Sequence, residues 1–219
     1  MNSSEQPKLV YIAQRHPRYG PGDFTSRWRQ HAALGMSQPR WRNIARYLHC
    51  DHIDGLPSGV TVVECDGVAI VVYLSEAHRR EHIAVEEARR TMKADELETF
   101  AQPVSRTSLL STEQLVSPAS GESFRLFVFW ASESAQFHYS WDAAAIRWGR
   151  ALPRDVGLVR NMPTGDPGEF RCAGIDELIA THPEPLCDLA RQWEQGSRLP
   201  GVARMALTRT TILHDQPQT

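Results

Sequence analysis

A histidine on an aromatic helix face is the first group in this sequence that could do chemistry. Phe24, Trp28 and His31 follow one another at spacings of four and three residues, so a helix carries them on one side. A stripe that opens with Phe and Trp is expected to be buried, and it takes the histidine inward. His31 is then either a hydrogen-bonded core residue or the acid–base group of a pocket, because imidazole exchanges protons near neutral pH.

The helix that carries this stripe is expected to begin at Asp23, whose carboxylate can cap free backbone N–H groups. It is expected to end near Gly35. Its other face is polar and is predicted to point to water; the residues are Arg27, Arg29 and Gln30.

A second set of polar side chains lies on a predicted strand from Asn43 to Cys50. Alternation places Tyr47, His49 and Asp51 on one side with Ala45; the other side carries Ile44, Arg46, Leu48 and Cys50. Alternation does not decide which side faces the helix. Tyr47 is either an ordinary sheet tyrosine or a donor to a substrate oxygen. His49 is either a strand-end histidine near solvent or a substrate contact, and Asp51 either orients it or caps a turn.

Neither a metal nor a cofactor is predicted. His49 and His52 with Asp51 lack the spacing of known zinc sites, while His78 and His82 lie one helical turn apart among charged neighbours. The four cysteines are far apart and form no CxxC pair, so they are expected to be reduced core residues. Removal of metal by a chelator is therefore expected to leave activity unchanged.

The composition predicts an ordinary globular protein. The chain has 219 residues, of which 41% are hydrophobic, and a formal net charge of −2. No basic stripe indicates a nucleic-acid partner. The longest apolar run, Val68 to Leu74, is too short to span a bilayer, and Met1 to Lys8 lack the apolar run of a signal peptide. The predicted location is the cytoplasm, without a membrane partner.

The same order of elements is predicted twice. In the first half the strands and helices follow the ferredoxin-like order βαββαβ, with strands at 9–13, 43–50, 68–74 and 104–110, a helix at 76–92, and a hairpin-like extension at 60–64. After a linker at 112–122, strands at 125–130, 155–161, 169–175 and 202–213 and helices at 141–152 and 185–195 repeat it. Leu9 and Leu126 are separated by 117 residues, as are Phe24 and Trp141, which predicts an internal duplication with domains at 8–112 and 123–214.

The two predicted copies differ at the histidine. Trp148 occupies the position that corresponds to His31. An indole there would fill the volume that a ligand needs. One functional pocket per chain is therefore expected, in the first copy, with the second closed by packing.

Residues 8–113 resemble the EthD family of the dimeric α+β barrel superfamily. The residues that carry the resemblance are the Phe24-x3-Trp28-x2-His31-Ala32 run, Asn43 to Tyr47, Cys65 to Ala69, Ala94-Asp95-Glu96 with Phe100, and Glu113. The resemblance implies sheets that pair through one face into a barrel, helices on the other face, and a small, mostly apolar pocket between sheet and helices. With the duplication, one chain would form an α+β barrel by itself, and a homodimer is left open.

The resemblance also implies a metabolic protein acting on a small hydrophobic or aromatic substrate, often without a cofactor, although some members of the superfamily bind haem. The predicted function is a cofactor-independent lyase or isomerase that dehydrates, decarboxylates or rearranges an aromatic or polyketide-like molecule. The alternatives are a cofactor-free oxygenase of phenolic or anthrone-type substrates and a non-catalytic binding protein in a catabolic cluster. The predicted catalytic residues are His31 and Tyr47, and the predicted substrate-binding residues are Trp28, Phe24, Tyr11, His49 and Tyr73.

Overall fold

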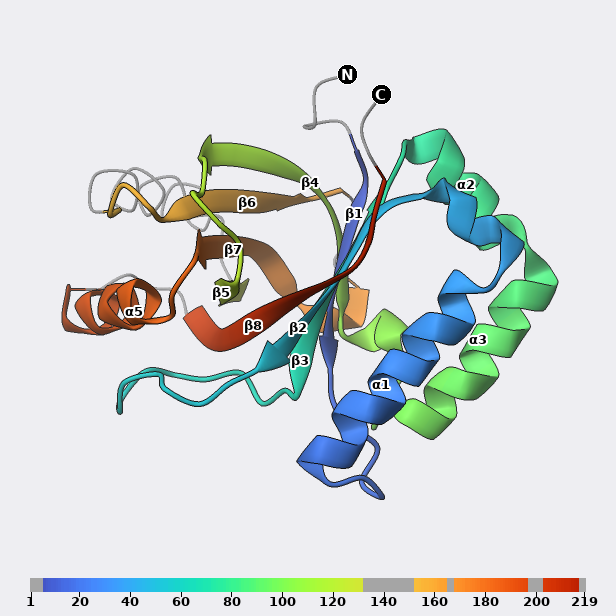
Figure 1. Ribbon diagram of the computed structural model, residues 1–219, viewed down its shortest axis with the longest axis horizontal. Helices are drawn as coiled ribbons and strands as arrows, with labels where there is room; N and C mark the ends of the chain where they lie inside the picture. Colours follow the sequence, from blue (N-terminus) through green and yellow to red (C-terminus); the bar gives the residue numbers. More distant parts are fainter. Residues whose placement is uncertain (1–5, 132–151, 165–167, 197–202, 217–219) are drawn as a thin grey trace.

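Eight antiparallel strands close into a barrel in the computed structural model, which describes residues 6–131, 152–164, 168–196 and 203–216 (Figure 1). The order around the barrel is β1-β3-β2-β8-β5-β7-β6-β4, and β4 pairs with β1 to close it. The strands are β1 (Lys8–Ala13), β2 (Ile44–His52), β3 (Gly67–Tyr73), β4 (Ser108–Ser117), β5 (Phe124–Ala131), β6 (Gly157–Pro163), β7 (Cys172–Ala180) and β8 (Ala203–Asp215). The expected α+β barrel is confirmed.

Each half of the chain supplies four adjacent strands of the barrel. The first half contributes β4-β1-β3-β2 and the second contributes β8-β5-β7-β6, so both halves place their fourth, first, third and second strands in that order. The halves join where β2 pairs with β8 and where β4 pairs with β6. Both joints are antiparallel, and the closed barrel has no free sheet edge.

The inside of the barrel is apolar along most of its length and charged at one end. Side chains such as Leu48, Ile70 and Phe127 form the apolar part. At the charged end, Lys8 Nζ lies 2.6 Å from Glu177 Oε1, and Arg125 lies 2.6 Å from Glu177 Oε2. Glu177 is fully buried, so these two cations compensate a carboxylate that water cannot reach.

The helices lie outside the barrel. On the first half these are α1 (Pro21–Met36), α2 (Glu76–Ala84) and α3 (Glu86–Thr99), which cover one side of the molecule (Figure 1). The buried residues of α1 include Phe24, Trp28 and His31, as the spacing of the stripe predicts. None of the helices in the described part of the chain has the length and apolarity that crossing a bilayer requires.

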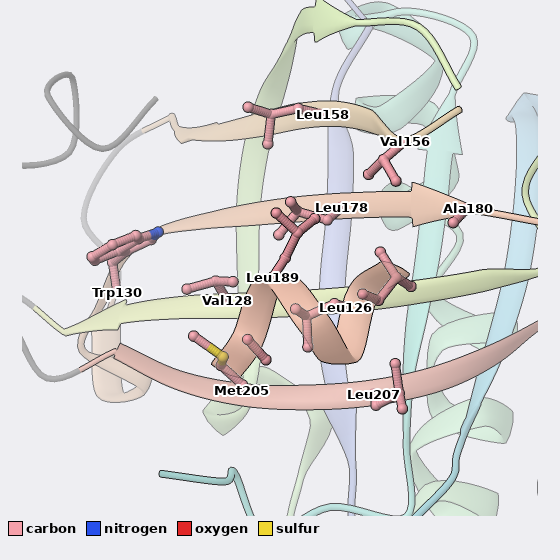
Figure 2. Packing of buried hydrophobic residues seen from close by; sticks show 12 residues of the cluster. Leu126, Val128, Trp130, Val156, Leu158, Leu178, Ala180, Leu189, Met205 and Leu207 are labelled. Atoms are coloured by element: carbon pink, nitrogen blue, oxygen red, sulfur yellow. The ribbon is translucent and has the colours of Figure 1, made fainter. Parts of the chain in front are cut away.

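The outer face of the second half packs against α5 (Glu184–Gly196). Figure 2 shows Leu189 of this helix among strand residues such as Leu126, Val128 and Leu178. The loop between β2 and β3 also packs here, through Ile53 and other apolar residues. The predicted helix at 141–152 with Trp141 and Trp148 lies outside the described residues, apart from its last position.

Several boundaries differ from the sequence prediction. The helix α1 begins at Pro21 and has no side-chain cap, so Asp23 lies in its first turn instead of capping its start. The predicted strand at 169–175 begins later, at Cys172, because a short 3-10 helix occupies Gly168–Phe170. The predicted helix at 76–92 is two helices, because Val85 has an extended backbone that ends α2, and α3 continues to Thr99. The predicted extension at 60–64 forms a loop with one isolated bridge, from Val62 to Met205. The predicted linker at 112–122 is strand as far as Ser117, because β4 continues beyond β1 to pair with β6.

Gly67 is expected to be intolerant of a side chain. A Cβ atom there would lie 2.6 Å from Cζ3 of Trp28 and 2.8 Å from the carbonyl oxygen of Cys50. The backbone of β2 cannot move independently of the sheet, so Gly67→Ala should lower the free energy of unfolding by about 1–3 kcal/mol. Urea denaturation measures the change. Gly22→Ala is the control, because its Cβ would meet no atom within 4 Å; equal losses in both variants would contradict the prediction.

Candidate active site between α1 and the sheet

The outer face of β2 places a tyrosine and a histidine against α1. The Trp28 ring stacks on the His49 ring, with 3.7 Å between ring centroids and 16° between planes. Tyr47 belongs to the same buried layer, whereas Leu48 and Cys50 face the inside of the barrel. The structure therefore decides what alternation left open: the Tyr47 and His49 side of β2 faces the helix.

A β-bulge at the start of β2 moves Ile44 to this same side. The pairing of β2 with β3 shifts between Ile44 and Arg46, which leaves Ala45 as the extra residue. Ile44 packs in the cluster that contains Tyr47, although strict alternation predicts opposite sides. That prediction is wrong for Ile44, because a bulge interrupts the two-residue period of the side chains.

A continuous chain of polar contacts runs between α1 and the sheet. Trp28 Nε1 donates to the Tyr11 hydroxyl at 3.3 Å, and the hydroxyls of Tyr11 and Tyr47 are 3.2 Å apart. The Tyr47 oxygen lies 2.6 Å from Nε2 of His49. The other ring nitrogen of His49 contacts the guanidinium of Arg29. Three elements, α1, β1 and β2, thus contribute side chains to one row of hydrogen bonds.

Arg29 points back to the sheet, although the helical pattern predicts that it points to water. Its guanidinium contacts His49 and forms an ion pair with Asp51, and 26% of its side chain is exposed. The long aliphatic stem lets a residue on the polar side of α1 reach the strand below. Asp51 therefore holds the arginine that contacts His49, instead of capping a turn.

His31 contacts a carboxylate on α3. Its Nδ1 lies 2.6 Å from Oδ2 of Asp95, while Arg27 pairs with Oδ1. Phe100 stands edge-on to the imidazole, with 5.1 Å between ring centroids. Because the carboxylate accepts a hydrogen bond from Nδ1, the lone pair of neutral His31 lies on Nε2. Arg27, which was also predicted to face water, instead helps to hold Asp95.

Burial favours the neutral forms of the histidines and tyrosines in this layer. It lowers the pKa of His31, although Asp95 opposes this, and it lowers the pKa of His49 strongly, together with the charge of Arg29. Burial raises the pKa of Asp95, but hydrogen bonds from Arg27 and His31 lower it more, and the net shift is downward. Burial also raises the pKa of both tyrosines in the chain of contacts. Neutral imidazoles can accept a proton, and neutral phenols can donate one.

The seven residues predicted from the sequence all lie in this layer, though not in one network. Phe24 stacks on Trp28, with 5.7 Å between centroids. Tyr73 lies apart and contacts His82 edge-on at 5.6 Å. Sequence reasoning assigns no role to Arg29 or Asp95, and it leaves Asp51 between orienting His49 and capping a turn. For Asp95 a signal existed, because it stands in the Ala94-Asp95-Glu96 run that carries the family resemblance.

Two aromatic side chains fill the space between α1 and the sheet. Phe24 and Trp28 are almost completely buried there. His31 and Tyr47 are not among the residues that line five cavities in the described part of the chain.

Two cavities lie nearby. One of about 630 Å³ lies between α3 and the short helix η3 (Val104–Arg106), with Leu9, Met92 and Leu97 among its apolar lining. Leu9 is on the same side of β1 as Tyr11, because the two are two residues apart on a strand. The other cavity, of about 360 Å³, lies at the charged end of the barrel, where Lys8 and Arg125 line it.

Among the described residues, no group of three His, Cys, Asp or Glu side chains could hold a metal ion. Haem iron is bound in proteins by His, Cys, Met or Tyr. In the layer between α1 and the sheet, both ring nitrogens of His49 have partners, so this histidine offers no free nitrogen to a haem iron.

Solved structures share this fold over nearly the whole chain. A provisionally assigned monooxygenase from Fusobacterium nucleatum matches with a TM-score of 0.55 and 10% identity, covering 97% of this chain and 95% of that chain. A provisionally assigned chlorite dismutase matches at 0.56 and 8% over 95% of each chain. An anthrone oxidase-like protein matches at 0.53 and 8%, covering 98% and 96%. The chain has the dimeric α+β barrel fold. No family model and no curated protein matches the sequence.

The names of these neighbours correct the predicted function. They name a monooxygenase, a chlorite dismutase and an anthrone oxidase-like protein, and none names the lyase or isomerase that the sequence predicted. They favour the oxidative alternative instead. The error has a physical reason: a histidine beside a carboxylate serves equally in proton transfer that leads to elimination and in proton transfer that precedes oxidation.

Asp95→Asn should lower the pKa of His31 further. The carboxylate stabilises the imidazolium form, and its loss leaves the positive charge of Arg27 unopposed nearby. An NMR titration of the histidine ring protons measures the shift. Asp23→Asn removes a carboxylate from the first turn of the same helix and should leave the His31 titration unchanged. A His31 pKa that rises or stays constant in Asp95→Asn would refute the assigned pair.

Proposed function

We propose that the protein is an oxygenase that acts on small phenolic or anthrone-type aromatic molecules without a bound cofactor. The observation that carries this proposal is the hydrogen bond between His31 and Asp95, which leaves Nε2 of a neutral imidazole ready to take a proton inside an aromatic layer. The names of the structural neighbours support the reaction class.

The chemistry needs a base and a hydrogen-bond donor. His31 takes the proton of the phenol, or of the enol form of an anthrone, and a tyrosine hydroxyl donates to the resulting anionic oxygen. The anion transfers an electron to O₂, and the two radicals combine into a peroxide anion on carbon. The proton that His31 took returns to this anion and gives a hydroperoxide. Loss of water leaves a carbonyl, so a CH₂ group and O₂ become C=O and H₂O. The substrate supplies all the electrons.

Substrate binding requires a rearrangement of the aromatic layer. Phe24 and Trp28 occupy the space beside His31 and Tyr47. The cavity under α3 lies on the same side of the sheet as Tyr11 and offers an approach lined partly by apolar side chains. Binding would then displace one of the two rings toward solvent or into that cavity.

A non-catalytic ligand-binding protein is the second candidate. The cavity at the charged end of the barrel favours it, because it is open, lies on the opposite side of β2 from Tyr47, and has both apolar and charged walls. Binding of a small molecule there without O₂ uptake would support this candidate over the oxygenase.

We further propose that residues 8–112 and 123–214 are copies of one ferredoxin-like unit, the first of EthD type. The identical strand order of the two halves supports a duplication, as does the shared spacing of 117 residues. A small aromatic substrate, a homodimer and a cytoplasmic location remain predictions.

The proposed reaction should consume O₂ in the presence of anthrone, as measured with an oxygen electrode. Replacing His31 by Gln should reduce the rate by about 10²–10⁴-fold, because a positioned base is lost. His78→Gln is the matched control, since His78 is a histidine of α2 that contacts Ser75. Undiminished O₂ uptake in His31→Gln, or none in the wild type with any phenol or anthrone tested, would rule the proposal out.

A further inference from the structure

Arg29 determines which nitrogen of His49 carries the proton. A guanidinium group has only hydrogen-bond donors, so the Nδ1 atom of His49 that meets Arg29 must accept. His49 is fully buried next to this positive charge and is neutral, so its one proton lies on Nε2. Nε2 lies 2.6 Å from the Tyr47 oxygen and therefore donates to it.

With this tautomer, one of the two hydroxyl protons of Tyr11 and Tyr47 has no hydrogen-bond acceptor among the described residues. Tyr47 accepts from His49, and Tyr11 accepts from Trp28. The contact between the two hydroxyls uses one of their two protons, whichever of them donates. The other proton has no acceptor among the residues that the structure describes. Both side chains are at least nine-tenths buried, where an unpaired donor costs about 1–3 kcal/mol.

The other tautomer would leave neither hydroxyl proton unpaired, but it would point the Nδ1 proton of His49 at Arg29. If Nε2 of His49 accepted, Tyr47 would donate to it, Tyr11 would donate to Tyr47, and Trp28 would donate to Tyr11. Each hydroxyl would then have used its proton. The spare proton thus exists only because Arg29 excludes this arrangement, and Arg29 is itself held by Asp51 and lies 5.4 Å from the centroid of the Trp28 ring.

We propose that the spare hydroxyl proton of the Tyr11–Tyr47 pair is the binding point for a carbonyl or phenolate oxygen of the ligand, and that Arg29 is the positioning residue that creates it. The ligand oxygen restores the missing hydrogen bond and so offsets the cost of the buried donor. The class of ligand rests on the proposed oxygenase function, whereas the proton arrangement rests on the contacts alone.

The proton arrangement can be tested without any substrate. Long-range ¹H–¹⁵N correlation spectra of the ¹⁵N-labelled full chain should show His49 protonated on Nε2. In Arg29→Met, the population should move to the Nδ1-protonated form, and in Arg29→Lys the ammonium donor should restore the wild-type pattern. Arg27→Met is the control, because Arg27 contacts Asp95. Wild-type His49 protonated on Nδ1, or an unchanged tautomer in Arg29→Met, overturns the proposal.

The binding point is tested with anthrone under anaerobic conditions, where no turnover occurs and tryptophan fluorescence reports affinity. Tyr11→Phe and Tyr47→Phe each keep one hydroxyl with a free proton, so each should weaken binding less than tenfold. The double variant has no hydroxyl left and should weaken binding about 100-fold, beyond the sum of the single effects. Wild-type affinity in the double variant, or no binding by the wild type, overturns the ligand assignment.

Turnover separates this proposal from the proposed function. Arg29→Met should weaken anaerobic binding of anthrone and raise KM in an O₂-uptake assay, because the spare proton that binds the ligand oxygen is lost. Arg29→Lys should restore much of the wild-type KM, since Arg29 acts through His49 without touching the substrate. If anthrone binds anaerobically and His49 has the predicted tautomer but no O₂ is consumed, the oxygenase proposal is refuted and the binding point stands. Unchanged binding and KM in Arg29→Met would overturn the positioning role.

Discussion

Closure of the barrel depends on two strand pairings between halves of the chain that are far apart in sequence. β2 pairs with β8 and β4 with β6, and these joints turn two open sheets into a closed one. Closure creates an inside that the chain has to fill. Most of it is apolar, but Glu177 from the second half is buried between Lys8 of the first half and Arg125 of the second. Replacing one partner alone would leave a buried charge uncompensated, so this end of the barrel also links the halves.

Because the inside of the barrel is occupied, the outer face of the sheet is where the helices and the chemical groups meet. Trp28 covers His49 and rests at Gly67, where a larger residue would not fit. The same ring donates to Tyr11, so one indole both fills the layer and takes part in its polar chain. Burial of two histidines and two tyrosines in this layer is tolerated because each ring has a hydrogen-bond partner; they are His31, His49, Tyr11 and Tyr47.

The fold by itself is compatible with several reactions. The neighbours named as a monooxygenase, a chlorite dismutase and an anthrone oxidase-like protein share the barrel at 8–10% identity, and this similarity establishes architecture. The proposed chemistry of this chain depends on the groups on the outer face of β2 and on α1. Under the proposed function, His31 with Asp95 is the base and the pair of tyrosines is the donor. Both ring nitrogens of His49 are occupied, by Arg29 and by Tyr47, so this histidine has no free nitrogen for a haem iron.

Local periodicity was sufficient to predict several features of this protein. The spacing of Phe24, Trp28 and His31 determined a buried helix stripe, and β-branched runs such as 68–74 determined strands, because both patterns depend on residues close in sequence. Only the tertiary structure decided which face of β2 meets α1, that a bulge turns Ile44 to this face, and that β4 extends to Ser117. It also decided the partners of Arg27 and Arg29, which on a helical wheel are simply polar. Each of these features depends on contacts between segments that are distant in sequence. The periodicity of the sequence does not show which distant residue a long side chain such as arginine will contact.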